Sequence, residues 1–146
     1  MSIQENKTLV RSYWEEVENK KNFALMDKLF ARDYTHHDPG LPPEMQNGLE
    51  NYKKVTAMFY VAMPDLKGTQ EDVIAEGDRV VSRMIFRGTH RGDLMGIPPT
   101  GKKVTIDVLA IHRISEGKIA EAWVNFDALG LMRQLGAIPA PETAAR

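Results

Sequence analysis

Residues 103–126 read KVTIDVLAIHRISEGKIAEAWVNF, and apolar side chains recur in this stretch at every second position. Such alternation is typical of a β-strand that presents one face to a protein core. Ser115, Glu116 and Gly117 interrupt the alternation with residues that favour a tight turn. The stretch therefore predicts an antiparallel hairpin. The same period, read from Leu66 onward, predicts strands over 67–76, 78–90, 103–114 and 117–126.

The alternation also predicts which side of each strand faces the interior. The inward set comprises Val80, Ser82, Met84, Phe86, His90, Val104, Ile106, Val108, Ala110, Ala120, Ala122, Val124 and Phe126. The outward set still contains the apolar residues Leu109, Ile111, Ile119 and Trp123. Because monomers rarely expose so much apolar surface in one place, we expect a homodimer that forms through the outer face of the sheet.

The residues before Leu66 follow a helical period instead. Ser2 and Glu5 have the spacing of a capping box, and apolar residues at positions 9, 10, 13, 14 and 17 predict a first helix. A second, short helix is expected from Asn22 and a third from about 47 to 63. Residues 33–40, which end in Pro and Gly, predict a loop between them.

The chain end predicts one more helix. Asp127 stands where an N-cap is expected, and Leu129, Leu131, Met132 and Leu135 follow at helical spacing. Residues 139–146 are expected to form a frayed tail. Helices first and an antiparallel meander afterwards predict an α+β fold, with residues 1–138 as a single domain.

Composition narrows the classes of function. The formal net charge is -1 with the charges dispersed, which argues against nucleic acid as a partner. There are no cysteines, so disulfides and thiolate metal sites are excluded, and the histidines show no spacing typical of metal ligands. No stretch is long and apolar enough to span a membrane. We expect a cytoplasmic protein without metal or cofactor.

Several short blocks, in this order, resemble the SnoaL-like polyketide cyclases of the nuclear transport factor 2-like superfamily. The blocks are Phe59 to Leu66, Ala75 to Asp78, Gly88-Thr89-His90, Gly96 to Gly101, Gly117-Lys118-Ile119, Glu121-x-Trp123 and Gly130 to Gly136. The resemblance extends over about residues 5 to 138. It implies a cone-shaped α+β barrel, in which the helices and a strongly curved sheet enclose an apolar pocket, and it implies cofactor-independent ring closure by aldol condensation.

The catalytic residues of the cyclases do not carry over with the fold. In those enzymes an aspartate on the last long strand acts as general acid and base, and a histidine on the preceding strand faces the same pocket. The corresponding positions here are Val124 and Ala110, and an isopropyl group cannot take a proton from carbon. The resemblance therefore leaves both altered chemistry and plain ligand binding open.

Three other residues are candidates for proton transfer, each with a structural alternative. His37 matches the histidine of the family's Asp-Tyr-x-x-His pattern, and His36 and Asp38 flank it, so that one imidazole could be oriented toward the pocket. His90 ends the inward set of its strand, or it bonds to the turn backbone. Asp127 lies near the place of the cyclase acid, or it caps the closing helix.

The predicted ligand is a small apolar or aromatic molecule. Residues expected to line its pocket are Tyr13, Trp14, Phe59, Met84, Phe86, Met95, Ala110 and Val124. We predict either a cofactor-independent enzyme that cyclises, isomerises or hydrolyses a carbonyl compound, or a non-catalytic binding or scaffold protein that keeps the pocket. Ionisable groups converging on one cavity would favour the enzyme, and a wholly apolar cavity would favour the binder.

Overall fold

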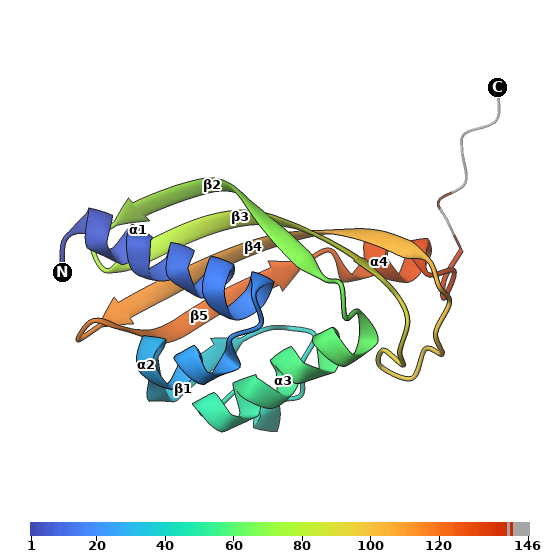
Figure 1. Ribbon diagram of the computed structural model, residues 1–146, viewed down its shortest axis with the longest axis horizontal. Coiled ribbons are helices and arrows are strands. Elements are labelled where there is room, and N and C mark those ends of the chain that lie inside the picture. The colour runs from blue at the N-terminus through green and yellow to red at the C-terminus, as the bar shows by residue number, and fades with distance from the viewer. Residues whose placement is uncertain (140, 142–146) are drawn as a thin grey trace.

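A five-stranded sheet arches over the N-terminal helices in the computed structural model, which describes residues 1–139 and 141 (Figure 1). The strand order is β1-β5-β4-β3-β2. The strands are β1 (Phe30–His37), β2 (Lys67–Glu76), β3 (Arg79–Thr89), β4 (Lys103–Ser115) and β5 (Lys118–Phe126). The four strands expected after Leu66 are confirmed, together with the α+β class. The predicted tail falls largely on residues outside the described part of the chain.

The helices lie before the antiparallel strands and after them. They are α1 (Ile3–Ser12), the π-helix η1 (Tyr13–Asn19), the 3-10 turn η2 (Phe23–Leu25), α2 (Met26–Leu29), the 3-10 turn η3 (Pro43–Met45), α3 (Leu49–Ala62) and α4 (Ala128–Gln134). The capping box predicted for the first helix is present: Ser2 Oγ accepts from the backbone N–H of Glu5, and the Glu5 carboxylate accepts from the backbone N–H of Ser2. Asp127 caps α4 through the backbone N–H of Gly130. No helix in the described residues is long and apolar enough to cross a membrane.

Strand β1 corrects two predictions. Residues 33–40 were expected to be a loop, but Phe30–His37 form an edge strand that pairs in parallel with β5. The sheet is therefore mixed rather than wholly antiparallel. The short polar stretch has no clear alternation because the pairing register shifts between Phe30 and Thr35, as at a β-bulge. The consequence is functional, since β1 places His36 and His37 on opposite faces of the sheet.

The predicted inward face is largely confirmed. Val104, Ile106, Ala110 and Ala122 are buried, and Val108, Val124 and Phe126 are partly buried against the same core. Ile119 was expected to face outward but is fully buried, because the β4–β5 register shifts at Arg113/Ile114 and reverses the alternation beyond it. Leu109 is exposed on the outer face, as expected.

Candidate functional site

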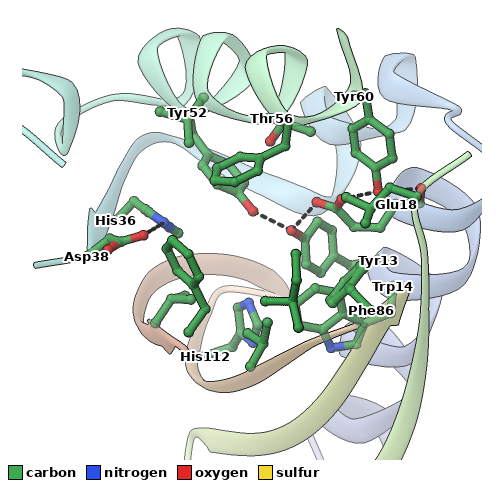
Figure 2. Close-up of a pocket in the computed structure, with 17 residues that line it drawn as sticks. Tyr13, Trp14, Glu18, His36, Asp38, Tyr52, Thr56, Tyr60, Phe86 and His112 are labelled. Atoms are coloured by element: carbon green, nitrogen blue, oxygen red, sulfur yellow. Dashed lines mark hydrogen bonds and ion pairs between the residues drawn. The ribbon is translucent and has the colours of Figure 1, made fainter. Parts of the chain in front are cut away.

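One cavity lies between the concave face of the sheet and the helices (Figure 2), with a volume of about 110 Å³. Its lining combines apolar walls with ionisable groups. The lining residues are Tyr13, Trp14, Glu18, His36, Asp38, Tyr52, Val55, Thr56, Phe59, Tyr60, Leu66, Phe86, Ile106, Val108, His112, Val124 and Phe126. Phe59, Val108, Val124 and Phe126 are only partly buried, so they form the mouth. Tyr13 and His112 are almost fully buried and form the closed end.

The π-helix explains how a carboxylate reaches the closed end. In a π-helix, residues five apart lie one above the other, and Tyr13 and Glu18 have this spacing. The Tyr13 hydroxyl donates to Glu18 Oε1 at 2.5 Å. A regular α-helix turns about 100° per residue, so over five residues it would place Glu18 about 140° around the axis from Tyr13. Helix η1 thus buries Tyr13, Trp14, Val17 and Glu18 on one side.

Tyrosine hydroxyls from α3 complete the environment of Glu18 (Figure 2). The Tyr60 hydroxyl donates to Glu18 and lies 2.6 Å from Oε2, and the hydroxyls of Tyr52 and Tyr13 bond to each other. Burial raises the pKa of Glu18 despite these hydrogen bonds, which favour the carboxylate. Burial likewise raises the pKa of Tyr13 and of Tyr52. The polar groups of Glu18 and of the three tyrosines are therefore hydrogen-bonded to one another.

A second polar group enters from the end of β1. Asp38 lies in the cavity lining, and its Oδ1 accepts from the backbone N–H of Gly40 at 2.8 Å. Its other oxygen, Oδ2, lies 4.0 Å from Nε2 of His36. Burial raises the pKa of Asp38, with the Gly40 N–H opposing the shift. The cavity thus contains a carboxylate whose basicity exceeds that of a solvated aspartate.

His36 is held firmly beside Asp38. Its Nδ1 lies 2.8 Å from the Tyr34 hydroxyl, and its ring stacks on Tyr52 with the centroids 4.5 Å apart. Burial, assisted by nearby His37, lowers the pKa of His36 to about 4. The imidazole is therefore neutral at physiological pH, and its Nε2 is directed toward the Asp38 carboxylate.

His112 lies on the sheet side of the cavity, across from Tyr52 on α3 (Figure 2). Its ring packs edge-on against Tyr13 and Trp14, with centroids 5.6 Å away in both cases. Burial lowers the pKa of His112 to about 3, and His36 adds to the shift. In the described residues its buried Nδ1 has no hydrogen-bond partner.

The aromatic wall depends on a glycine in β2. Gly68 pairs with Phe86, and a Cβ at position 68 would meet Phe86 Cε1 at 2.6 Å. Such a distance is shorter than van der Waals contact, so glycine allows the Phe86 ring to lie flat across the strand. The ring then packs against Trp14, with the centroids 5.8 Å apart.

The family profile described as SnoaL-like polyketide cyclase matches residues 8–135, which is most of the chain. The chain belongs to this family. A nogalonic acid methyl ester cyclase from Streptomyces nogalater is 30% identical over 111 residues, covering 71% of this chain and 81% of that protein. The aklanonic acid methyl ester cyclase DnrD from Streptomyces peucetius is 30% identical, covering 68% and 70%.

A solved structure supports the same assignment. AclR from Streptomyces galilaeus, for which a hydroxylase activity has been suggested, is 26% identical and superposes with a TM-score of 0.85. The match covers 97% of this chain and 87% of that chain. The cone-shaped α+β barrel implied by the sequence resemblance is therefore the fold of this SnoaL-like protein.

Five of the eight residues predicted to contact a ligand line the cavity of this SnoaL-like fold, and three do not. The five are Tyr13, Trp14, Phe59, Phe86 and Val124. Met84 and Ala110 are buried on the concave side but do not line the cavity. Met95 is exposed, because Leu94 is the residue of its loop that packs inward.

The three predicted proton-transfer residues are not brought together, and none of them lines the cavity. His37 lies on the outer face, where Nε2 is 2.6 Å from Glu121 and the ring stacks on Trp123. His90 is buried, and its Nδ1 accepts from the backbone N–H of Thr100 at 3.2 Å. Asp127 caps α4. Of the histidine pair on β1, His36 is the one whose imidazole reaches the cavity.

Sequence reasoning missed Glu18, Tyr52, Tyr60 and His112 as cavity residues and named Asp38 only as a neighbour. Two signals could have found some of them. His112 continues the inward alternation of β4 after Ala110, and Tyr52 and Tyr60 share a face of α3 two turns apart. Nothing in the sequence indicated that Glu18 reaches the cavity, because the π-helix departs from the period of a regular α-helix. Among residues 1–139 and 141, no group of three His, Asp or Glu side chains could hold a metal ion.

Proposed function

We propose that this chain is a cofactor-independent enzyme of the polyketide cyclase type, which removes a proton from the carbon next to a carbonyl group in a small aromatic compound. The observation that carries the proposal is the buried Asp38 carboxylate, which lies in an otherwise largely apolar cavity beside His36. The acid expected at position 124 is absent, but Asp38, which directly follows β1, brings a carboxylate into the same cavity.

Asp38 is the proton acceptor in this proposal. Burial raises the pKa of Asp38, and a base is most effective when its pKa approaches the working pH. Neutral His36, fixed by the hydroxyl of Tyr34 and by stacking on Tyr52, lies 4.0 Å from the carboxylate and adds no positive charge that would lower its basicity. Hydrogen bonding from Gly40 fixes the other carboxylate oxygen.

The proposed step balances without an external reagent. Asp38 takes the proton, the electrons of the broken C–H bond form an enolate, and the negative charge moves to the carbonyl oxygen. In a cyclisation the enolate carbon then attacks a second carbonyl of the same molecule, forming a C–C bond and an alkoxide. Asp38 returns its proton to that alkoxide, so that the enzyme ends in its starting state.

The cavity size limits what can be enclosed. An apolar cavity of roughly 150 Å³ accommodates one benzene ring, so a volume of about 110 Å³ favours a single ring at the closed end. Further rings of a polyketide would extend out of the mouth past Phe59 and Phe126, whose rings pack edge-on against each other with centroids 5.9 Å apart. The names of two relatives refer to nogalonic acid methyl ester and aklanonic acid methyl ester as the compounds that they cyclise.

The rival function is a binding protein that keeps the pocket without chemistry. A wholly apolar cavity would favour it, whereas this cavity contains Glu18, His36, Asp38 and His112. Four ionisable groups in one cavity of about 110 Å³ carry a large desolvation cost, which a protein that only binds an apolar ligand has no reason to bear.

Hydrogen–deuterium exchange at the methyl group of acetophenone in D₂O tests the proposal, because exchange needs only proton removal. Proton NMR should show exchange with the wild-type protein well above the buffer rate, and Asp38→Asn should abolish the excess. Glu121→Gln, which removes a carboxylate on the outer face, serves as the matched control and should retain exchange. Exchange that survives Asp38→Asn would exclude Asp38 as the base.

We also propose that the chain forms a homodimer through the outer face of the sheet. Leu109 and Ile74 are exposed there, and the half-buried Trp123 ring stacks on His37 and lies 4.7 Å from the guanidinium carbon of Arg79. Leu109→Lys should convert a species of about twice 16.5 kDa into a monomer in light scattering. A wild-type monomer would contradict this proposal.

A further inference from the structure

The closed end of the cavity contains one polar side chain whose hydrogen-bonding capacity is unused. Tyr13, Tyr52, Tyr60 and Glu18 bond among themselves. His36 is engaged by Tyr34 and faces Asp38. His112 differs from all of them, since the described residues provide no partner for its buried Nδ1.

Such an unpaired nitrogen requires an explanation. A buried polar group without a partner costs roughly 1 to 3 kcal/mol, and native proteins rarely contain one. His112 is one of the lining residues, it is 1% exposed, and its aromatic neighbours Tyr13 and Trp14 are cavity residues as well. Since the described residues supply no partner for Nδ1, and His112 lines the cavity, the contents of the cavity are the available source of one.

We infer that His112 is a specificity-determining residue that binds the carbonyl oxygen at the buried end of the substrate. A neutral imidazole carries one N–H, which can donate to a carbonyl oxygen, and it donates more strongly as negative charge develops on that oxygen. The substrate then enters with its oxygenated ring first and leaves its apolar part at the mouth, where Phe59, Val108, Val124 and Phe126 lie.

The charge state of His112 suits this role. Burial keeps the imidazole neutral, because its pKa is lowered to about 3. The titratable groups that face it are those of the cavity: Tyr13 in direct contact, Glu18 beyond it, and His36 and Asp38 near the end of β1. A neutral donor next to Tyr13 adds no positive charge that would hold Asp38 or Glu18 permanently ionised.

Two isosteric ligands separate this inference from the proposed function, on whose cavity it rests. Acetophenone and α-methylstyrene have the same shape, but the second carries a CH₂ group in place of the carbonyl oxygen. Dissociation constants measured by calorimetry should show that His112→Phe weakens the binding of acetophenone, relative to that of α-methylstyrene, by about tenfold. A tenfold change corresponds to the loss of one hydrogen bond. His112→Gln, which keeps an N–H donor, should restore part of the difference.

Controls distinguish the possible failures. Ile106→Val reshapes the cavity wall without a polar change and should change the dissociation constants of both ligands by the same factor. Equal shifts for both ligands in His112→Phe would overturn the role of His112 while leaving the cavity as the ligand site. Failure of both ligands to bind the wild-type protein would overturn this inference and the proposed function together.

Nitrogen-15 spectra supply a readout that a merely structural histidine would not change. The four histidines give separate imidazole signals, and those of His112 are identified by their loss in His112→Gln. Acetophenone should shift the His112 ring nitrogens, whereas α-methylstyrene should not. A shift confined to His36 would assign the oxygen to the other polar group of the cavity and overturn the inference.

Discussion

Two neighbouring histidines on β1 form carboxylate pairs on opposite faces of the sheet. On the inner face, Nε2 of His36 lies 4.0 Å from Oδ2 of Asp38, in a buried and largely apolar setting. Outside, His37 lies 2.6 Å from Glu121, and Arg113 bonds to the same carboxylate at 2.9 Å. The outer pair has the shorter contact, yet the inner pair is the one that lines the cavity.

The two carboxylates are tuned in opposite directions. Hydrogen bonding to His37, helped by Arg113, lowers the pKa of Glu121 and makes it a weak base. Burial raises the pKa of Asp38, which makes it a stronger one. The short contacts of Glu121 are therefore suited to stabilising the structure, whereas the longer contact of Asp38 in the buried cavity leaves a carboxylate suited to proton transfer.

The largest expected effect is on catalysis. Asp38→Asn should lower the rate of substrate deprotonation by roughly 10² to 10⁴, because the amide cannot accept the proton. Glu121→Gln should change the rate less than twofold. Initial rates at pH 7 with both purified variants measure the contrast, and comparable losses in the two variants would show that the faces do not differ in function.

Buried and exposed glutamates of helix η1 extend the comparison to stability. Glu18→Ala should reduce the free energy of unfolding by roughly 2 to 4 kcal/mol, because the hydroxyls of Tyr13 and Tyr60 lose their acceptor. Glu16→Ala removes only an exposed pair with Lys20 and should cost about 0.5 kcal/mol or less. Urea unfolding of both variants decides the point, and equal costs would contradict the buried network.

Acid should destabilise the inner face through its histidines. The pKa values of His36 and His112 are lowered in the folded state, to about 4 and about 3. The contribution of the two neutral imidazoles to the free energy of unfolding is therefore complete above pH 6.5, and it is lost as the pH falls toward those values. Each pKa unit corresponds to about 1.4 kcal/mol. Between pH 6.5 and 4, the free energy of unfolding of His112→Phe should therefore fall by about 3 kcal/mol less than that of the wild type. If the free energy of unfolding depended on pH equally in both proteins, this would argue against the burial of His112 as a neutral group.

The smallest expected effect concerns the cavity wall. Gly68→Ala should push the Phe86 ring into the cavity, weakening acetophenone binding several-fold and costing about 1 kcal/mol of stability. The adjacent Thr69 is exposed, and Thr69→Ala should leave ligand affinity unchanged. Calorimetry on the two variants makes the comparison, and unaltered affinity in Gly68→Ala would mean that Phe86 does not limit the cavity.

The sequence predicts the antiparallel strands well because apolar residues alternate along most of β4 and along most of β5. It fails where local geometry departs from a regular period. Strand β1 contains a register shift and is followed closely by Pro39 and Gly40, so Phe30–His37 gives no alternating signal. Ile119 is buried rather than exposed because a register shift between β4 and β5 reverses the alternation.

The candidate site was harder to predict than the fold for the same reason. Glu18 reaches the cavity only through the π-helix, and a helical wheel with the usual period does not place it beside Tyr13. Which of His36 and His37 faces the cavity depends on the alternation along β1, and this stretch was predicted to be a loop. The pocket walls Tyr13, Trp14, Phe59, Phe86 and Val124 could be predicted, because each lies on a regular apolar stripe.

The most direct test of the inner face as the site is a crystal structure of the protein soaked with acetophenone. The ring should lie against the Trp14 and Phe86 side chains, with the carbonyl oxygen at hydrogen-bond distance from His112 and the methyl carbon next to Asp38. Density for the ligand on the outer face beside His37 and Glu121, or a cavity that stays free of ligand at saturating concentration, would contradict the account.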